Sequence, residues 1–224
     1  MSKTSIAKAI LQELTREMEN VGYCFDKETS SVELNIFTKE NALQKTVLSY
    51  SLNGRGNYKA FGQIKIIYKD LSEIMKDIFK NSKLSEDYDY QKSTAYWEGV
   101  GIYSTIGRFS NDKTIYHCNS KETSIDFAKN YARQIKSEEE NFINPHLNQK
   151  TTIEEFMKPM HHFWPGDLRA FLEHLVGYAI KTSDTNLLKY AFQKAEDVSE
   201  KLVPQARSTD FTAELKNATR NIML

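Results

Sequence analysis

The stretch that most constrains the fold runs from residue 96 to residue 109 and reads YWEGVGIYSTIGRF. It is long enough to cross a whole sheet, and the side chains of a strand alternate between two faces. One face of this stretch interleaves three glycines with three aromatic residues, Trp97, Tyr103 and Phe109. Glycine weakens a strand unless another backbone or a large ring lies close to it. We therefore predict that residues 96–109 form a central strand around which the chain is arranged.

The remainder of the N-terminal half predicts helices and antiparallel strands. Apolar residues recur at helical spacing over residues 5–19 and 70–79, and Asp70 is the expected N-cap of the second helix. Alternating segments that are separated by short polar turns predict strands at residues 21–25, 32–37, 43–52, 61–68 and 114–118. The alternation slips near Lys45, which predicts a β-bulge at that position.

From Ser120 onward the pattern is helical almost throughout. Helices are predicted at residues 120–142, 152–159 with Thr152 as N-cap, 167–180, 184–202 and 211–222. The short link near Asp184 predicts that the third and fourth of these form an antiparallel hairpin. The expected fold class is α+β, with a mainly antiparallel sheet and packed helices followed by an all-helical part. We expect an α+β domain at residues 1–146 and a helical subdomain at 147–224 packed on it, with a single domain as the alternative.

Composition excludes several functional classes. The 224 residues carry 30 basic and 30 acidic side chains, and this zero net charge disfavours nucleic acid as a partner. No run of 18 apolar residues and no signal peptide is present, so we expect no membrane partner and a cytoplasmic location. Cys24 and Cys118 are far apart in the sequence and predict neither a disulfide framework nor a structural zinc site. We expect no cofactor.

A histidine cluster, MHHFWPGD at residues 160–167, is the main candidate for chemistry. A metal or acid–base site requires its ligands to converge on one point, whereas the adjacent His161 and His162 must point in different directions. Asp167 is already explained as a helix N-cap, and His174 is expected to be half exposed beside an apolar stripe. We therefore favour a structural helix corner, with Trp164 in the core, and predict no metal site and no catalytic residue.

A recognition surface fits the aromatic enrichment better. Tyr88, Tyr90, Tyr96, Trp97 and Tyr103 fall in and beside the expected central strand, next to an acidic run at residues 86–89. Tyrosine and tryptophan are the residue types that dominate interface hot spots. The alternative is sheet core, because aromatic residues at a period of two usually serve packing. We predict these five residues as the binding residues.

The order of elements, the phrase VGIY at residues 100–103 and the long helix that ends in Asn144-Pro145 together resemble small bacterial α+β families of unknown function. Some members of such families look like immunity proteins that neutralise a cognate toxin. The resemblance covers about the first two-thirds of the chain and is one of layout, and it matches no active-site residue. It implies a protein partner, with a toxin as one candidate.

Three functional hypotheses follow. The first is a non-enzymatic intracellular protein-binding module, with an immunity protein as its specific form. The second is a hydrolase-like enzyme that uses His161 or His162 with Asp167 or Glu173. The third is a structural or scaffold subunit that binds through its helical hairpin, which would show a concave apolar groove.

Overall fold

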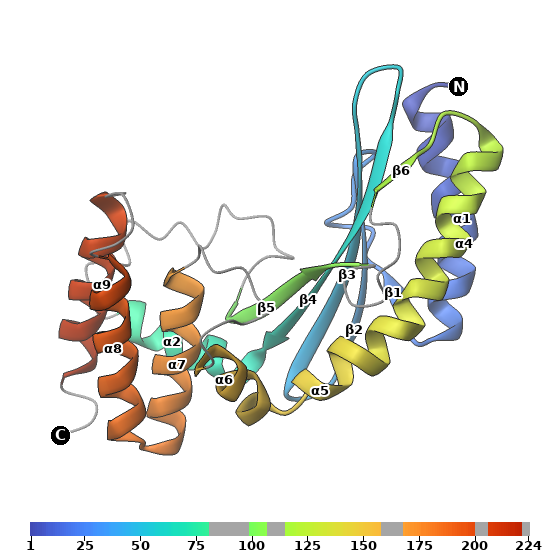
Figure 1. Cartoon of the computed structure of the whole chain (residues 1–224). Coiled ribbons are helices and arrows are strands. Elements are labelled where there is room, and N and C mark those ends of the chain that lie inside the picture. The colour runs from blue at the N-terminus through green and yellow to red at the C-terminus, as the bar shows by residue number, and fades with distance from the viewer. Residues whose placement is uncertain (81–98, 107–114, 158–167, 200–205, 221–224) are drawn as a thin grey trace. The chain divides into compact units, whose positions relative to one another are not determined.

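The computed structural model describes residues 1–80, 99–106, 115–157, 168–199 and 206–220, and it has the expected α+β layout (Figure 1). The strands are β1 (Cys24–Phe25), β2 (Leu34–Glu40), β3 (Gln44–Asn53), β4 (Lys59–Tyr68), β5 (Gly101–Thr105) and β6 (Ile115–His117). The helices are α1 (Lys3–Asn20), α2 (Lys69–Lys80), α4 (Lys121–Glu138), the π-helix η2 (Glu139–Ile143), α5 (Asn144–His146), α6 (Gln149–Met157), α7 (Leu168–Thr182), α8 (Thr185–Ser199) and α9 (Ala206–Thr219).

Internal contacts divide the chain into two compact units. Unit 1 comprises Met1–Ile66 and Tyr103–Asn148, and unit 2 comprises Ile67–Ile102 and Gln149–Leu224. The sequence predicted one boundary, between residues 146 and 147. The division differs because α2 packs on α7 and α9, which brings residues 67–102 into the same unit as the C-terminal helices.

The strands form one sheet in the order β1-β2-β3-β4-β5, and β6 also pairs with β4. The pairs β1–β2, β2–β3 and β4–β6 are antiparallel. The prediction of a central strand is wrong for the described part of residues 96–109, because β5 is the last strand in this order and β3 and β4 hold the interior positions. The start of β4 pairs with β6, so β5 and β6 share one edge of β4.

β3 has an uninterrupted register with β2, from the pair Leu34 and Ser51 to the pair Glu40 and Lys45. The predicted bulge near Lys45 is therefore wrong. Residues 46–50 of β3 are buried in succession, whichever face of the sheet they are on. The slip in the alternation therefore reflects a strand that is covered on both faces, for which a period of two is not expected.

In unit 1, α1 and α4 lie side by side over the sheet (Figure 1). The apolar stripe of α1, formed by Ile6, Ile10, Leu14 and Met18, is fully buried, as its spacing predicts. α4 begins with a capping box between Ser120 and Thr123. Its Tyr131 hydroxyl donates to the Ser49 carbonyl oxygen of β3 at 3.0 Å, which ties the helix to the middle of the sheet.

In unit 2, α7 and α8 form the predicted helical hairpin. The Asp184 carboxylate accepts hydrogen bonds from the Asn186 and Leu187 amides at the start of α8, so Asp184 is the N-cap of this helix. Met75 of α2 lies against Gly177 of α7, with its Cγ 3.5 Å from the position that a Cβ would occupy. α2, α6, α7, α8 and α9 thus enclose a separate helical core.

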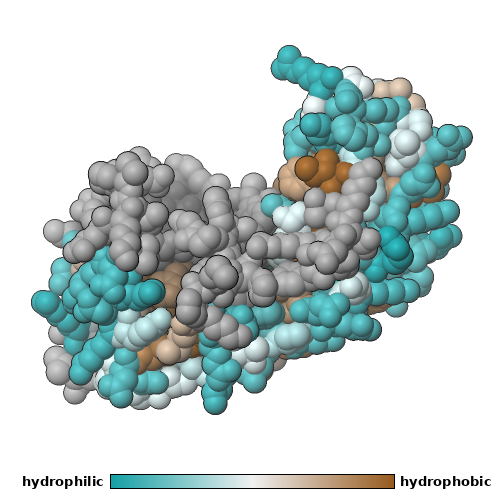
Figure 2. Space-filling view, in the orientation of Figure 1, coloured by the Kyte–Doolittle hydropathy of each residue, from teal (hydrophilic) through white to brown (hydrophobic). Residues whose placement is uncertain are grey.

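The described surface is mostly hydrophilic on the face that Figure 2 shows, with small hydrophobic patches between the hydrophilic areas. Large apolar residues that remain exposed are scattered along the chain: Met1, Val32, Leu43, Ile115, Leu147 and Met157. Among the described helices, none is long and apolar enough to cross a membrane.

Candidate functional site

Four of the five predicted binding residues, Tyr88, Tyr90, Tyr96 and Trp97, lie outside the described residues. The fifth, Tyr103, belongs to β5, and only the backbone of this residue is described. The predicted recognition surface at residues 88–103 therefore stays a prediction.

The predicted histidine cluster at residues 160–167 also lies outside the described residues, and with it His161, His162, Trp164 and Asp167. The hydrolase hypothesis consequently stays untested. His174 on α7 is described, and the expectation that it is half exposed is wrong, because only 1% of its surface is accessible.

His174 is buried because α6 and β4 bring aromatic rings against it. Its ring centroid lies 5.9 Å from that of Tyr68 and 5.0 Å from that of Phe156. The neighbouring Tyr68 hydroxyl is hydrogen-bonded to Thr152 Oγ1 at 2.5 Å. Burial raises the pKa of the Tyr68 hydroxyl, with the Thr152 bond acting in the opposite direction, so the hydroxyl stays protonated. This cluster is an element of the core of unit 2.

The predicted N-cap role of Thr152 is wrong, because α6 begins at Gln149 and Thr152 is fully buried within it. Asp70 likewise lies in the first turn of α2 and not before it. Its carboxylate accepts hydrogen bonds from Gln149 Nε2 and Lys181 Nζ, each at 2.6 Å. Desolvation raises the pKa of Asp70, but these bonds, the Leu71 amide and the Lys181 charge outweigh it, so the pKa is lowered. This triad joins α2, α6 and α7.

A second polar cluster lies in unit 1, around Lys39 of β2. Its Nζ lies 3.4 Å from Glu139 Oε1, 3.2 Å from the Val21 carbonyl oxygen and 5.3 Å from the centroid of the Tyr23 ring. One cation thus connects the end of α1, the sheet and the π-helix η2. We interpret this arrangement as a structural contact between these elements.

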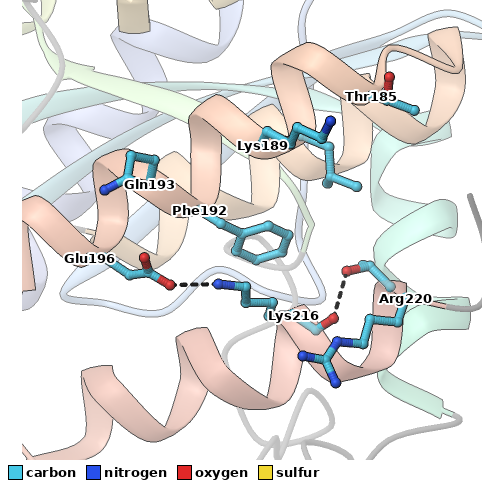
Figure 3. Close-up of a pocket in the computed structure, with 9 residues that line it drawn as sticks. Thr185, Lys189, Phe192, Gln193, Glu196, Lys216 and Arg220 are labelled. Carbon is cyan, nitrogen blue, oxygen red and sulfur yellow. Dashed lines mark hydrogen bonds and ion pairs between the residues drawn. The ribbon is translucent and has the colours of Figure 1, made fainter.

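The candidate binding site is a groove of about 510 Å³ between α8 and α9 in unit 2 (Figure 3). Six of its lining residues come from one face of α8 at spacings of three and four, two come from the last turn of α9, and Arg220 follows that helix directly. The lining residues are Thr185, Leu188, Lys189, Phe192, Gln193, Glu196, Lys216, Thr219 and Arg220. We call this site the α8–α9 groove.

The opposite face of α8 explains why this side of the helix remains accessible. Leu187, Ala191 and Ala195 repeat every four residues and are buried, as expected for the face that packs in the α7–α8 hairpin. Phe192 is only 6% exposed and forms the base of the groove, whereas Leu188 is half-buried beside it. The scaffold hypothesis expected an apolar groove on the helical hairpin, but the sequence analysis named no residues that would line it. The one pattern in the sequence that could have indicated the groove is the pair of basic residues Lys216 and Arg220, which are spaced to lie on the same side of a helix.

The groove carries an excess of positive charge. Its lining contains three cations, Lys189, Lys216 and Arg220, and one carboxylate, Glu196. Lys216 Nζ already lies 2.7 Å from Glu196 Oε1, and about half of each of these two side chains is exposed. Within the described residues, neither Lys189 nor Arg220 forms a salt bridge with its side chain, and both residues are exposed.

The chemistry of the groove suits binding. Its lining has neither cysteine nor histidine, and the hydroxyl of Thr219 donates to the Leu215 carbonyl oxygen at 2.9 Å. Groups of three or more potential metal ligands are absent from the part of the chain that the structure describes. An apolar base with charged rims is typical of a site that receives a side chain or a short segment of a ligand.

Comparison of the chain with protein-family models, with curated proteins and with solved structures gave no match.

Proposed function

We propose that the chain is a non-enzymatic protein-binding module that acts in the cytoplasm and receives a partner in the α8–α9 groove. The observation that carries this proposal is the groove itself, in which Phe192 and Leu188 present apolar surface between two helices. A concave apolar groove on the helical hairpin is also what a scaffold subunit would use. The scaffold hypothesis therefore shares this site and differs in how permanent the complex is.

The groove is too small to be a whole protein interface, so we propose that it forms one part of a larger one. A volume of about 510 Å³ accommodates a few side chains, whereas a standard interface buries about 800 Å² on each partner. Binding energy in such interfaces is concentrated in a few anchors that occupy well-formed pockets. In this proposal the groove receives those anchors, and the predicted surface at residues 88–103 supplies further contact area.

The resemblance in layout to immunity-protein-like families suggests a toxin as the specific partner. An immunity protein acts by occupying surface on its toxin, which requires no catalytic group on its own side. If the partner is a toxin, co-expression with this chain should prevent growth arrest, and Leu188→Ser should weaken that protection because the groove loses apolar surface.

A photo-cross-linking experiment tests the proposal directly. We would place a photoreactive phenylalanine derivative at Gln193 in the groove and, as a matched control, at Lys194. Both positions are exposed on α8, but Lys194 is not part of the lining, and neighbouring helical residues point about 100° apart.

The expected result is one dominant protein adduct from position 193 in the source cell and a much weaker one from position 194. The adduct should decrease in a Leu188→Ser background. Equal labelling from both positions, or none from position 193, would contradict binding in the groove. Size-exclusion chromatography with light scattering would then separate a permanent scaffold complex from a reversible one.

A further inference from the structure

We infer that the α8–α9 groove is specific for an acidic amphipathic helical segment of a protein partner. This inference rests on the proposed function and adds the chemistry of the partner. Two properties of the groove carry it, namely its length along α8 and the distribution of its charges.

The length of the groove matches a segment of about three helical turns. Its lining extends along α8 from Thr185 to Glu196, which corresponds to about 16 Å at 1.5 Å per residue. A site that holds a single side chain would not need lining residues over this distance. Helix-in-groove binding places apolar anchors at spacings of three, four and seven residues, and Leu188 and Phe192 provide apolar contacts for them one turn apart.

The charges of the groove are unevenly distributed. Near one end, Glu196 and Lys216 neutralise one another at 2.7 Å. Lys189 on α8 and Arg220 just after α9 lie away from this pair, and among the described residues neither has a carboxylate partner (Figure 3). A partner helix with apolar anchors and carboxylates beside them would therefore meet a cation on each side. A basic helix would meet repulsion at the same two positions.

Designed peptides provide the test. The probes are a fluorescein-labelled amphipathic peptide with leucine and phenylalanine anchors and glutamates beside them, a matched peptide with lysine in place of every glutamate, and a scrambled acidic peptide that has no apolar face. Binding to the full chain would be measured by fluorescence anisotropy at low and at physiological salt.

Two charge-reversal variants change the net charge by the same amount. They distinguish the effect of charges in the groove from the effect of the total charge of the protein. K189E/R220E changes the groove, whereas K8E/K194E changes two exposed lysines outside it. All four positions are exposed, so neither variant removes core packing, and circular dichroism verifies the fold. Leu188→Ser tests the apolar contact independently.

We expect the wild-type chain and K8E/K194E to bind the acidic amphipathic peptide equally. We expect K189E/R220E to bind it at least about fivefold more weakly and with a smaller dependence on salt. Leu188→Ser should weaken binding at both salt concentrations.

Four outcomes would overturn the inference: no binding of the acidic amphipathic peptide, equal or tighter binding of the basic peptide, equal binding of the scrambled peptide, or no effect of K189E/R220E. Tighter binding to phosphatidylserine vesicles or to a DNA duplex, lost in K189E/R220E, would instead assign the groove to another class of ligand. If the partner cross-links at position 193 while the peptides fail, the protein-binding proposal stands and the partner chemistry is wrong. If cross-linking fails as well, both are wrong.

Discussion

The backbone of Gly62 in β4 lies directly against the ring of Tyr131 in α4. A Cβ at position 62 would clash with Cε2 and Cδ2 of that ring and would lie 3.1 Å from Cδ1 of Ile106. The ring cannot easily withdraw, because its hydroxyl is held by the Ser49 carbonyl oxygen and Phe127 and Tyr50 pack against it.

Gly62→Ala should therefore lower the free energy of unfolding by about 1–3 kcal/mol, the usual cost of overpacking a core. Urea denaturation followed by circular dichroism would measure it. Gly177→Ala is the control, because a Cβ there meets Met75 at an ordinary 3.5 Å and alanine favours a helix. Equal destabilisation by both would contradict the account. In a Tyr131→Ala background the cost of Gly62→Ala should decrease, which a double-mutant cycle would show.

The hydrogen bond between Tyr68 and Thr152 should be visible as an energetic coupling. Both side chains are fully buried and their oxygens are 2.5 Å apart. Tyr68→Phe and Thr152→Val should each cost about 1–3 kcal/mol, since each leaves a buried polar group unsatisfied, and the double variant should cost less than their sum. Urea titrations of the four proteins give the coupling, and strict additivity would argue against the bond.

Asp70 should make stability depend on pH in the acidic range. Its folded pKa is lowered, while an unfolded aspartate titrates near about 3.9. The unfolded state then binds more protons, so this contribution is complete above the unfolded pKa and is lost as pH falls through the folded value. The stability difference between wild type and Asp70→Asn should be larger at neutral pH than in strong acid.

Glu154→Gln is a suitable control for this titration. Glu154 forms only a loose surface pair with Lys150, at 3.9 Å with both side chains mostly exposed, and such pairs contribute little. Thermal unfolding between about pH 2 and pH 7 covers the range in which an aspartate titrates. A pH-independent difference between wild type and Asp70→Asn would contradict the role of the triad.

Ser72 should slow the hydrogen exchange of the Val100 amide, which lies just before β5. Its Oγ accepts a hydrogen bond from the Val100 amide at 2.9 Å and donates one to the Tyr68 carbonyl oxygen at 2.6 Å. Ser72→Ala should therefore increase amide exchange at Val100 and lower the free energy of unfolding by about 0.5–1.5 kcal/mol. Hydrogen–deuterium exchange with residue resolution would show this. The Ile6 amide, bonded to the Ser2 carbonyl oxygen in the other unit, should keep its exchange rate.

Local patterns in the sequence were sufficient for the regular elements. The apolar spacing of α1, the strand at β4 and the short link near Asp184 each depend on neighbours within a few residues, and the structure confirms them. The glycines near residue 100 were expected to lie close to another backbone or a large ring, whereas the described Gly99 meets the side chains of Ser72 and Ile67. Gly99 has a φ of +103°, and a Cβ there would come within 2.7 Å of Ser72 Oγ.

Features set by distant segments could not be predicted in this way. The glycine that an aromatic ring covers is Gly62, and the ring is that of Tyr131, which is far from it in the sequence. The burial of His174 depends on Tyr68 and Phe156, and the side chains beside Asp70 come from α6 and α7. The lining residues of the groove could not be predicted for a similar reason, because an apolar stripe does not reveal which of its residues pack in the core and which line a groove beside a neighbouring helix.

Each unit is built from two separate stretches of the chain, and this arrangement determines when unit 2 can fold during synthesis. The apolar face of α2, with Leu71, Met75 and Ile78, is buried, and α2 packs against α7 and α9, which begin at Leu168 and Ala206. Until the ribosome has produced α7 and α9, that face lacks its contacts with these two helices. Unit 2 can therefore be completed only when the C-terminal helices have emerged. A nascent chain stalled before α7 should be captured by chaperones that bind exposed apolar helices.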